Sequence, residues 1–156
     1  MAVSLLSFSA ANAQETKIAF VSTERIFREA VPAKAAQTKL EQEFAKRDRE
    51  LQDMAARLKT QSEKMDKDAA VLSESDRAKR QRDLSDLDKE FQRKQREFRE
   101  DLNQRRNEEL AVVLERTNKV IRQIAEAEKF DIVFQEAVFA SKRIDITDKV
   151  LKELAK

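Results

Sequence analysis

The chain has 156 residues, and 40% of them are charged, divided almost equally between 32 basic and 30 acidic side chains. This composition leaves too little apolar surface for a large spherical core, and a net charge of +2 is too small to indicate a nucleic-acid partner. The chain contains no His, Cys or Gly, which excludes imidazole catalysis, a thiolate nucleophile, a Cys/His metal site and a glycine-rich phosphate loop. We therefore predict a protein that is not an enzyme and that uses neither a cofactor nor a metal.

The first residues have the features of an export signal. Residues 2–11 form a short apolar run, which is followed by Ala11, Asn12 and Ala13 and then by polar residues. An apolar run before an Ala-x-Ala sequence is typical of a secretory signal peptide, although no basic residue precedes the run here. We predict that residues 1–13 are a signal-peptide remnant cleaved after Ala13 and that the protein is exported; the alternative is a frayed N-terminus.

A short strand and a short helix are predicted next. The segment Lys17–Val21 is a compact apolar run, typical of a strand that is buried on both faces. Ser22 or Thr23 then provides the cap of a short helix. We expect this helix to break at Val31, because a residue before proline is disfavoured in the α region, whereas Pro32 suits the first position of the next helix.

Residues 33–127 contain no Gly or Pro, and their larger apolar residues are spaced as on one side of a helix. This pattern predicts two long antiparallel helices joined near residues 72–76. Ser73 together with Asp76, or Ser75 alone, offers a cap for the second helix. The sequence therefore predicts a helical hairpin arm.

The apolar seam of this hairpin is predicted to be narrow. In the first helix an apolar residue recurs every seven positions, as at one coiled-coil core position, whereas most residues at the other core position are polar, including Arg47, Gln61 and Asp68. The second helix continues the stripe between charged residues. The seam should therefore become more polar and more hydrated toward the tip of the arm. The predicted seam residues are Phe44, Leu51, Leu58, Met65, Phe91 and Phe98.

The C-terminal part returns to an apolar composition from Leu110 onward. Residues 130–134 alternate like a strand, Gln135 and Glu136 would form a turn, and residues 137–140 would form a third strand. A final helix is expected to be capped by Thr147.

Without the arm, only about 65 residues remain for the body, and a unit of that size with open strand edges is marginal alone. We therefore expect the body to oligomerise around its strands. The predicted fold is α+β and mostly α, with a long antiparallel coiled-coil hairpin (residues 36–110) on a small β-containing body (residues 14–35 and 111–156). The strand residues expected at the subunit contact are Ile18, Phe20, Ile132, Phe134 and Val138.

Four segments, in this order and spacing, resemble the Skp/OmpH family of periplasmic chaperones: Lys17–Val21, Leu40–Phe44, Arg105–Glu109 and Asp145–Leu151. The match covers essentially the whole chain after residue 13. The resemblance implies a jellyfish-like homotrimer whose three hairpins enclose a cavity. It also implies that the cavity holds unfolded outer-membrane β-barrel proteins in the periplasm without using nucleotide. From the small net charge and the predicted export, we expect no nucleic-acid partner.

Several alternatives remain open from the sequence. The seam residues could contact client chains inside such a cavity or could only hold the two helices together, and the two roles can coexist. A structural coiled-coil envelope protein without clients is the competing class, and a nucleic-acid module with a basic tip is a weaker one, which export would contradict. The basic residues around the predicted tip could meet anionic lipid, lipopolysaccharide or an acidic client segment, or could simply be solvated. These residues are Lys64, Lys67, Arg77, Lys79, Arg80 and Arg82.

Overall fold

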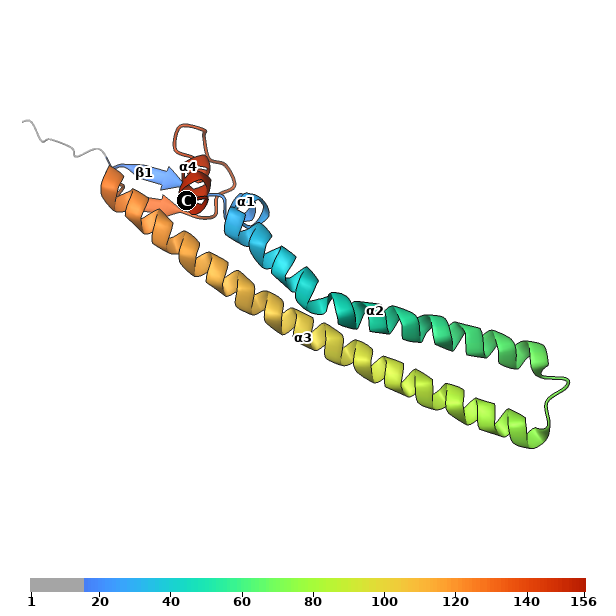
Figure 1. The fold of residues 1–156 in the computed structure, drawn as a ribbon. Helices are drawn as coiled ribbons and strands as arrows, with labels where there is room; N and C mark the ends of the chain where they lie inside the picture. The colour runs from blue at the N-terminus through green and yellow to red at the C-terminus, as the bar shows by residue number, and fades with distance from the viewer. Residues whose placement is uncertain (1–15) are drawn as a thin grey trace, which may run out of the picture.

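The structure is a computed structural model that describes residues 16–156, so the predicted signal peptide and its cleavage site lie outside the described residues. Two long helices form a hairpin that projects from a small body containing the remaining elements (Figure 1). The elements in chain order are β1 (Ile18–Phe20), α1 (Thr23–Glu29), α2 (Val31–Asp68), α3 (Glu74–Glu128), β2 (Ile132–Phe134) and α4 (Thr147–Leu154). In the part of the chain that the structure describes, none of the helices is both long and apolar enough to cross a membrane.

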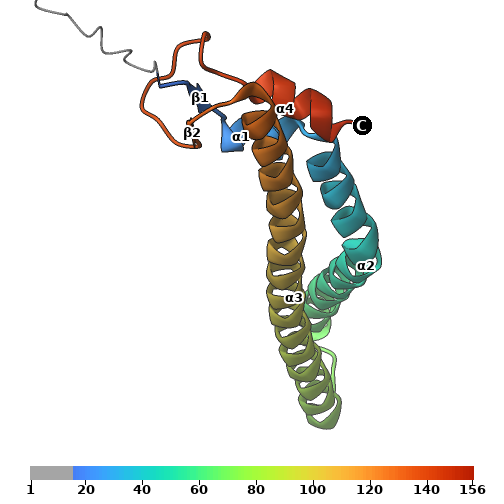
Figure 2. The ribbon, with the colours of Figure 1, turned by 90° about the vertical axis from the view of Figure 1, so that its left-hand side faces the viewer.

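The predicted hairpin of two long helices is confirmed. α2 and α3 run antiparallel, and α2 bends part of the way along its length (Figures 1 and 2). The turn lies slightly earlier than predicted, because α2 already ends at Asp68. The predicted cap at Ser73 is correct: its Oγ accepts a hydrogen bond from the backbone N–H of Asp76 at 3.1 Å and donates one to the Asp76 carboxylate at 2.6 Å.

The two strands form a parallel pair in which Ile18 lies opposite Ile132 and Phe20 lies opposite Phe134. Parallel strands cannot be joined by a tight turn and need a long crossover connection. Here the connection is the whole helical arm, because β1 precedes α2 and β2 follows α3. Pairing of β1 with β2 therefore fixes the two ends of the arm in the same small body.

The predicted third strand is wrong. Residues 137–140 form no strand but lie in the loop that leads to α4, where Val138 is fully exposed and Phe139 is 83% exposed. The predicted turn at Gln135 and Glu136 lacks a residue suited to positive φ, which a tight hairpin requires. β1 instead forms its second contact with the segment before α4, since Phe20 donates to the carbonyl of Ile144 at 2.8 Å.

Three smaller expectations also need correction. β1 is not buried on both faces, because Ala19 is buried whereas Ile18 is exposed. The break after α1 falls at Ala30, whose ψ of 139° is extended, so Val31 is already helical. Thr147 does not cap α4; it is the first residue of the helix and its side chain is buried.

The core of the body joins α1, β1, α4 and the end of α3. Thr147 contributes a polar link, because its Oγ1 accepts from the backbone N–H of Ser22 at 2.9 Å and donates to Asp145 Oδ1 at 2.5 Å. This link fixes the start of α1 against the start of α4. The buried apolar residues of the cluster are Ala19, Val21, Ile26, Ala30, Ile121, Ile124, Ile146, Val150 and Leu154.

Candidate functional site

The best-packed point of the arm seam is an aromatic pair. Phe44 of α2 is only 5% exposed, and its ring centroid lies 5.5 Å from that of Phe98 of α3 at an interplanar angle of 84°. The edge-to-face arrangement is a favoured one for aromatic rings. The guanidinium of Arg47 lies over both rings, 5.5 and 5.8 Å from their centroids, and pairs with Asp101 at 2.8 Å. These contacts hold α2 against α3.

Beyond this pair the seam is thin, in agreement with the prediction from the heptad pattern. Leu51, Leu58 and Met65 of α2 and Phe91 of α3 are only half-buried. Apolar burial stabilises in proportion to the area removed from water, so each of these residues contributes less than a core residue does. Of the six predicted seam residues, the structure thus brings Phe44 and Phe98 together across the hairpin and leaves the other four half-buried.

Ion pairs tie the two helices together at the base of the arm. Lys39 of α2 pairs with Glu109 of α3 at 2.6 Å, and Arg105 pairs with Glu43 at 3.1 Å and with Glu109 at 2.8 Å. The hydrogen bond from Lys39, assisted by one from Arg105, holds the pKa of Glu109 below its usual value, although partial burial opposes this shift. Hydrogen bonds to Glu43 and to two further carboxylates raise the pKa of Arg105.

At the tip of the arm the predicted basic residues divide into two groups. Arg80 pairs with Asp68 at 2.7 Å, and Arg77 donates to the backbone carbonyl of Ala69, so these two close the turn between α2 and α3. The other four are exposed and form no ion pair within the described residues. They are Lys64, Lys67, Lys79 and Arg82.

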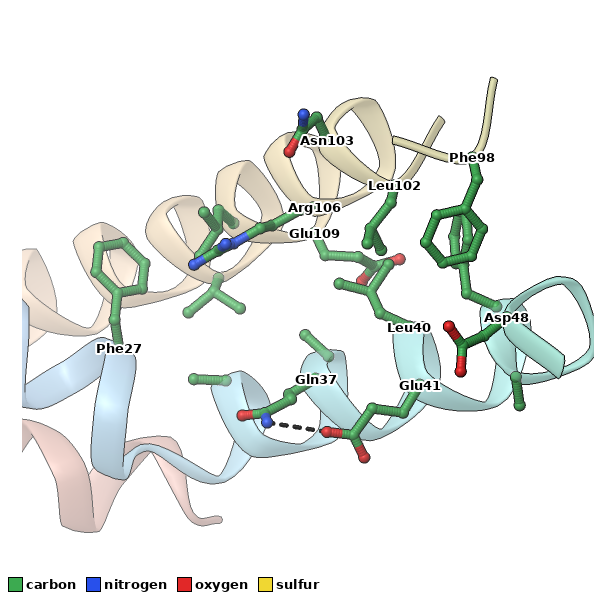
Figure 3. Close-up of a pocket in the computed structure, with 16 residues that line it drawn as sticks. Phe27, Gln37, Leu40, Glu41, Asp48, Phe98, Leu102, Asn103, Arg106 and Glu109 are labelled. Atoms are coloured by element: carbon green, nitrogen blue, oxygen red, sulfur yellow. Dashed lines mark hydrogen bonds between the residues drawn. The ribbon is translucent and has the colours of Figure 1, made fainter. Parts of the chain in front are cut away.

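A groove of about 730 Å³ lies between α2 and α3 where they leave the body, with Phe27 of α1 lining it as well (Figure 3). Leu40 and Leu102 point toward each other between the two helices (Figure 3). Ala33 and Ala36 line the α2 side, and their small side chains leave the space open. Sequence analysis did not predict this groove, and alanines within a long helix carry no signal that would have indicated it.

The strand residues that were predicted to meet another subunit are partly exposed in the single chain. Ile18, Ile132 and Phe134 are between 39% and 45% exposed, and Phe20 is half-buried. Val138 is fully exposed, but it lies in the loop and not in a strand. β2 pairs with β1 on one side only, so its other edge is open.

Residues 16–156 contain no group of His, Cys, Asp and Glu side chains that could hold a metal ion. Several carboxylates of the arm instead pair with neighbouring basic or amide side chains, such as Glu97 with Arg93 at 2.7 Å. The chemistry that the described surface offers is therefore apolar and electrostatic contact.

Comparison with known proteins gives consistent matches along the chain. Residues 17–154 match the family described as outer membrane protein (OmpH-like). The chain is 31% identical to the chaperone protein Skp of Yersinia enterocolitica over 148 residues, which cover 94% of this chain and 90% of the relative. It is also 31% identical to the chaperone protein Skp of Escherichia coli K12 over 88% of this chain and 86% of that one.

The fold also matches a solved structure. The crystal structure of an OmpH-like protein from Caulobacter crescentus CB15 superposes with a TM-score of 0.74 at 19% sequence identity. The match covers 90% of this chain and 84% of the other. At this level of identity the likeness concerns the fold, and it includes the helical hairpin as well as the body.

Proposed function

The chain belongs to the Skp/OmpH family of chaperones, a family that is not enzymatic, and from this premise we propose that it is an ATP-independent periplasmic holdase. Its clients would be unfolded outer-membrane β-barrel proteins, which it would bind in a cavity between several arms and protect from aggregation. The observation that carries the proposal is that the family match extends through both the body and the arm.

The physical character of the arm supports this role. A holdase that uses no nucleotide must release its client, so it needs many weak contacts instead of a few strong ones. The half-buried seam residues Leu51, Leu58 and Phe91 and the mixed charges around them offer contacts of this kind. The exposed tip residues Lys64, Lys67, Lys79 and Arg82 would add electrostatic attraction to an acidic client segment, to anionic lipid or to lipopolysaccharide.

We also propose that the body forms a homotrimer through its strands. The open edge of β2 and the exposed side chains of Ile132, Phe134, Val138 and Phe139 provide unpaired backbone groups and apolar surface in one part of the body. Open strand edges of this kind are normally covered or paired. In this scheme residues 14–35 and 111–156 assemble, residues 36–110 form each arm, and residues 1–13 direct export.

The proposal is tested by diluting a urea-unfolded outer-membrane β-barrel protein into buffer with and without the chain from residue 14 onward. We expect light scattering from aggregated client to be suppressed, with no effect of added ATP. Aggregation at the same rate with and without the protein would refute the holdase role.

The assembly is tested separately by multi-angle light scattering of the protein alone. A mass of three chains supports the cavity, whereas a monomer or a parallel dimer contradicts it and favours the structural coiled-coil class. Because this measurement involves no client, its outcome is independent of the aggregation assay.

A further inference from the structure

We infer that the groove at the base of the arm is a binding site for an extended segment of an unfolded polypeptide, with the apolar side chains of that segment seated between α2 and α3. This inference rests on the proposed function, because it names a specific contact site for the client. The groove lies between the body and the aromatic pair of Phe44 and Phe98, which line its far end together with Asp48 (Figure 3).

The floor of the groove is apolar and is contributed by three helices. Phe27 of α1, Leu40 of α2, and Leu102 and Val113 of α3 are among its lining residues. A volume of about 730 Å³ falls within the range of pockets that take up ligands. Apolar side chains that displace water from such a surface bury apolar area, and binding is stabilised in proportion to that area.

The length of the groove fits an extended segment. The lining residues of α2 run from Ala33 to Asp48, a distance of about 22 Å at the rise of an α-helix. An extended chain covers that distance with about seven residues, and about every second side chain faces the same way. A segment with apolar residues at alternate positions would therefore place three or four of them against the floor.

The polar side chains at the two edges of the groove are complementary to the backbone of such a segment. Glu41 and Asp48 on α2 accept hydrogen bonds only from Gln37 and Gln52, and neither carboxylate has a basic partner within the described residues. Arg106 on α3 likewise has no acidic partner there. The carboxylates on the α2 edge of the groove can accept hydrogen bonds from backbone N–H groups or attract a basic side chain. The guanidinium on the α3 edge can donate hydrogen bonds to backbone carbonyls.

The two walls of the groove are tied to each other by contacts within the chain itself. The ion pairs Lys39–Glu109 and Arg47–Asp101 join its two walls, and the aromatic pair of Phe44 and Phe98 closes one end. Ala33 and Ala36 line the groove on the α2 side, where larger side chains would fill the space. A site whose walls are held in this way needs little ordering when a segment binds.

The inference is tested by filling the groove with a side chain. Ala36→Phe places a ring in the groove, and Ala35→Phe is a matched control, because Ala35 is the neighbouring residue, is exposed and does not line the groove. The affinity for a fluorescently labelled, urea-unfolded outer-membrane β-barrel protein is measured on dilution, together with the oligomeric mass and the thermal unfolding of each variant. If Ala36→Phe fails to fold, Ala33→Leu fills the groove with a smaller side chain.

We expect Ala36→Phe to weaken client binding about tenfold, the effect of losing one well-buried apolar side chain, while Ala35→Phe binds like the unmodified protein. Equal binding by both variants would overturn the inference and leave the holdase role intact. A change in oligomeric mass for Ala36→Phe alone would also overturn it, because a second copy of the chain would then cover the groove. If the unmodified protein does not bind the client, the proposed function itself fails.

Discussion

Truncation of Phe44 to alanine should destabilise the arm more than any other single change in the seam. Its ring is 95% removed from solvent, whereas the other predicted seam residues are half-buried. Burial of a phenylalanine side chain stabilises by about 1.5–3 kcal/mol, and an aromatic pair adds about 0.5–1.5 kcal/mol. Water can enter from the adjoining groove, which limits the cost of an empty cavity. We therefore expect Phe44→Ala to lower the free energy of unfolding by about 3 kcal/mol, at the lower end of the usual range for such changes.

The measurement is urea unfolding followed by circular dichroism. All variants must be compared at the same protein concentration, because the stability of the proposed trimer would depend on it. Val71→Ala is a suitable control, since Val71 is 83% exposed in the turn between α2 and α3 and its truncation should change the stability by less than about 0.5 kcal/mol. Phe44→Leu should recover much of the loss, because it retains most of the apolar volume.

A double-mutant cycle isolates the ring contact from the general loss of burial. If Phe44 and Phe98 interact as the geometry indicates, the loss in the double variant should be smaller than the sum of the two single losses by about 0.5–1.5 kcal/mol. Strict additivity would refute the edge-to-face contact. A loss below about 1 kcal/mol for Phe44→Ala would refute the view that this point anchors the seam.

Three further predictions concern two buried threonines and the response to pH. Thr147→Val should destabilise the body by about 1–3 kcal/mol in urea unfolding, because it removes the oxygen that accepts from the backbone of Ser22. Thr117→Val should be neutral or stabilising in the same assay, because Thr117 is 3% exposed and its Oγ1 has no hydrogen-bond partner within the described residues. The lowered pKa of Glu109 means that the stability from its pair with Lys39 is present near neutral pH and is lost as the pH falls below about 4. The urea midpoint should therefore fall less steeply with acidification in Glu109→Gln, and an unchanged slope would contradict this assignment.

The parts of the fold that depend on local chemistry could be predicted from the sequence. The heptad stripe predicted that Phe44 and Phe98 lie on facing sides of a hairpin, and the side chain of Ser73 marked the start of α3, because both signals lie within a few residues of the feature that they specify. The burial of Val150 and Leu154 on one side of α4 follows from helical spacing in the same way.

The strand pairing could not be predicted on the same basis. Residues 137–140 have the apolar composition of a strand, but composition indicates only that side chains are suited to burial and does not identify what would cover them. The actual partner of β2 is β1, which pairs Ile18 with Ile132 across the whole arm. A contact between residues so far apart leaves no local signal in a single sequence.

The groove escaped prediction for a different reason. Ala33 and Ala36 are strong helix formers, so in the sequence they are indistinguishable from alanines that merely support a long helix. Their effect depends on the residues that face them from α3, such as Val113, and therefore on how the two helices are aligned. Only the structure establishes that alignment.

The distribution of polar contacts along the arm determines where α2 and α3 can separate most easily. Ion pairs join α2 to α3 at the base, as between Lys39 and Glu109, and at the tip, as between Asp68 and Arg80. Within the described chain, no hydrogen bond or ion pair joins residues 48–67 to residues 81–97. The middle of the arm is therefore held by half-buried apolar contacts alone, and each of these contributes less than a core residue does. The groove lies on the body side of this section and is bounded by the tied base, so its shape can stay fixed while the middle of the arm opens.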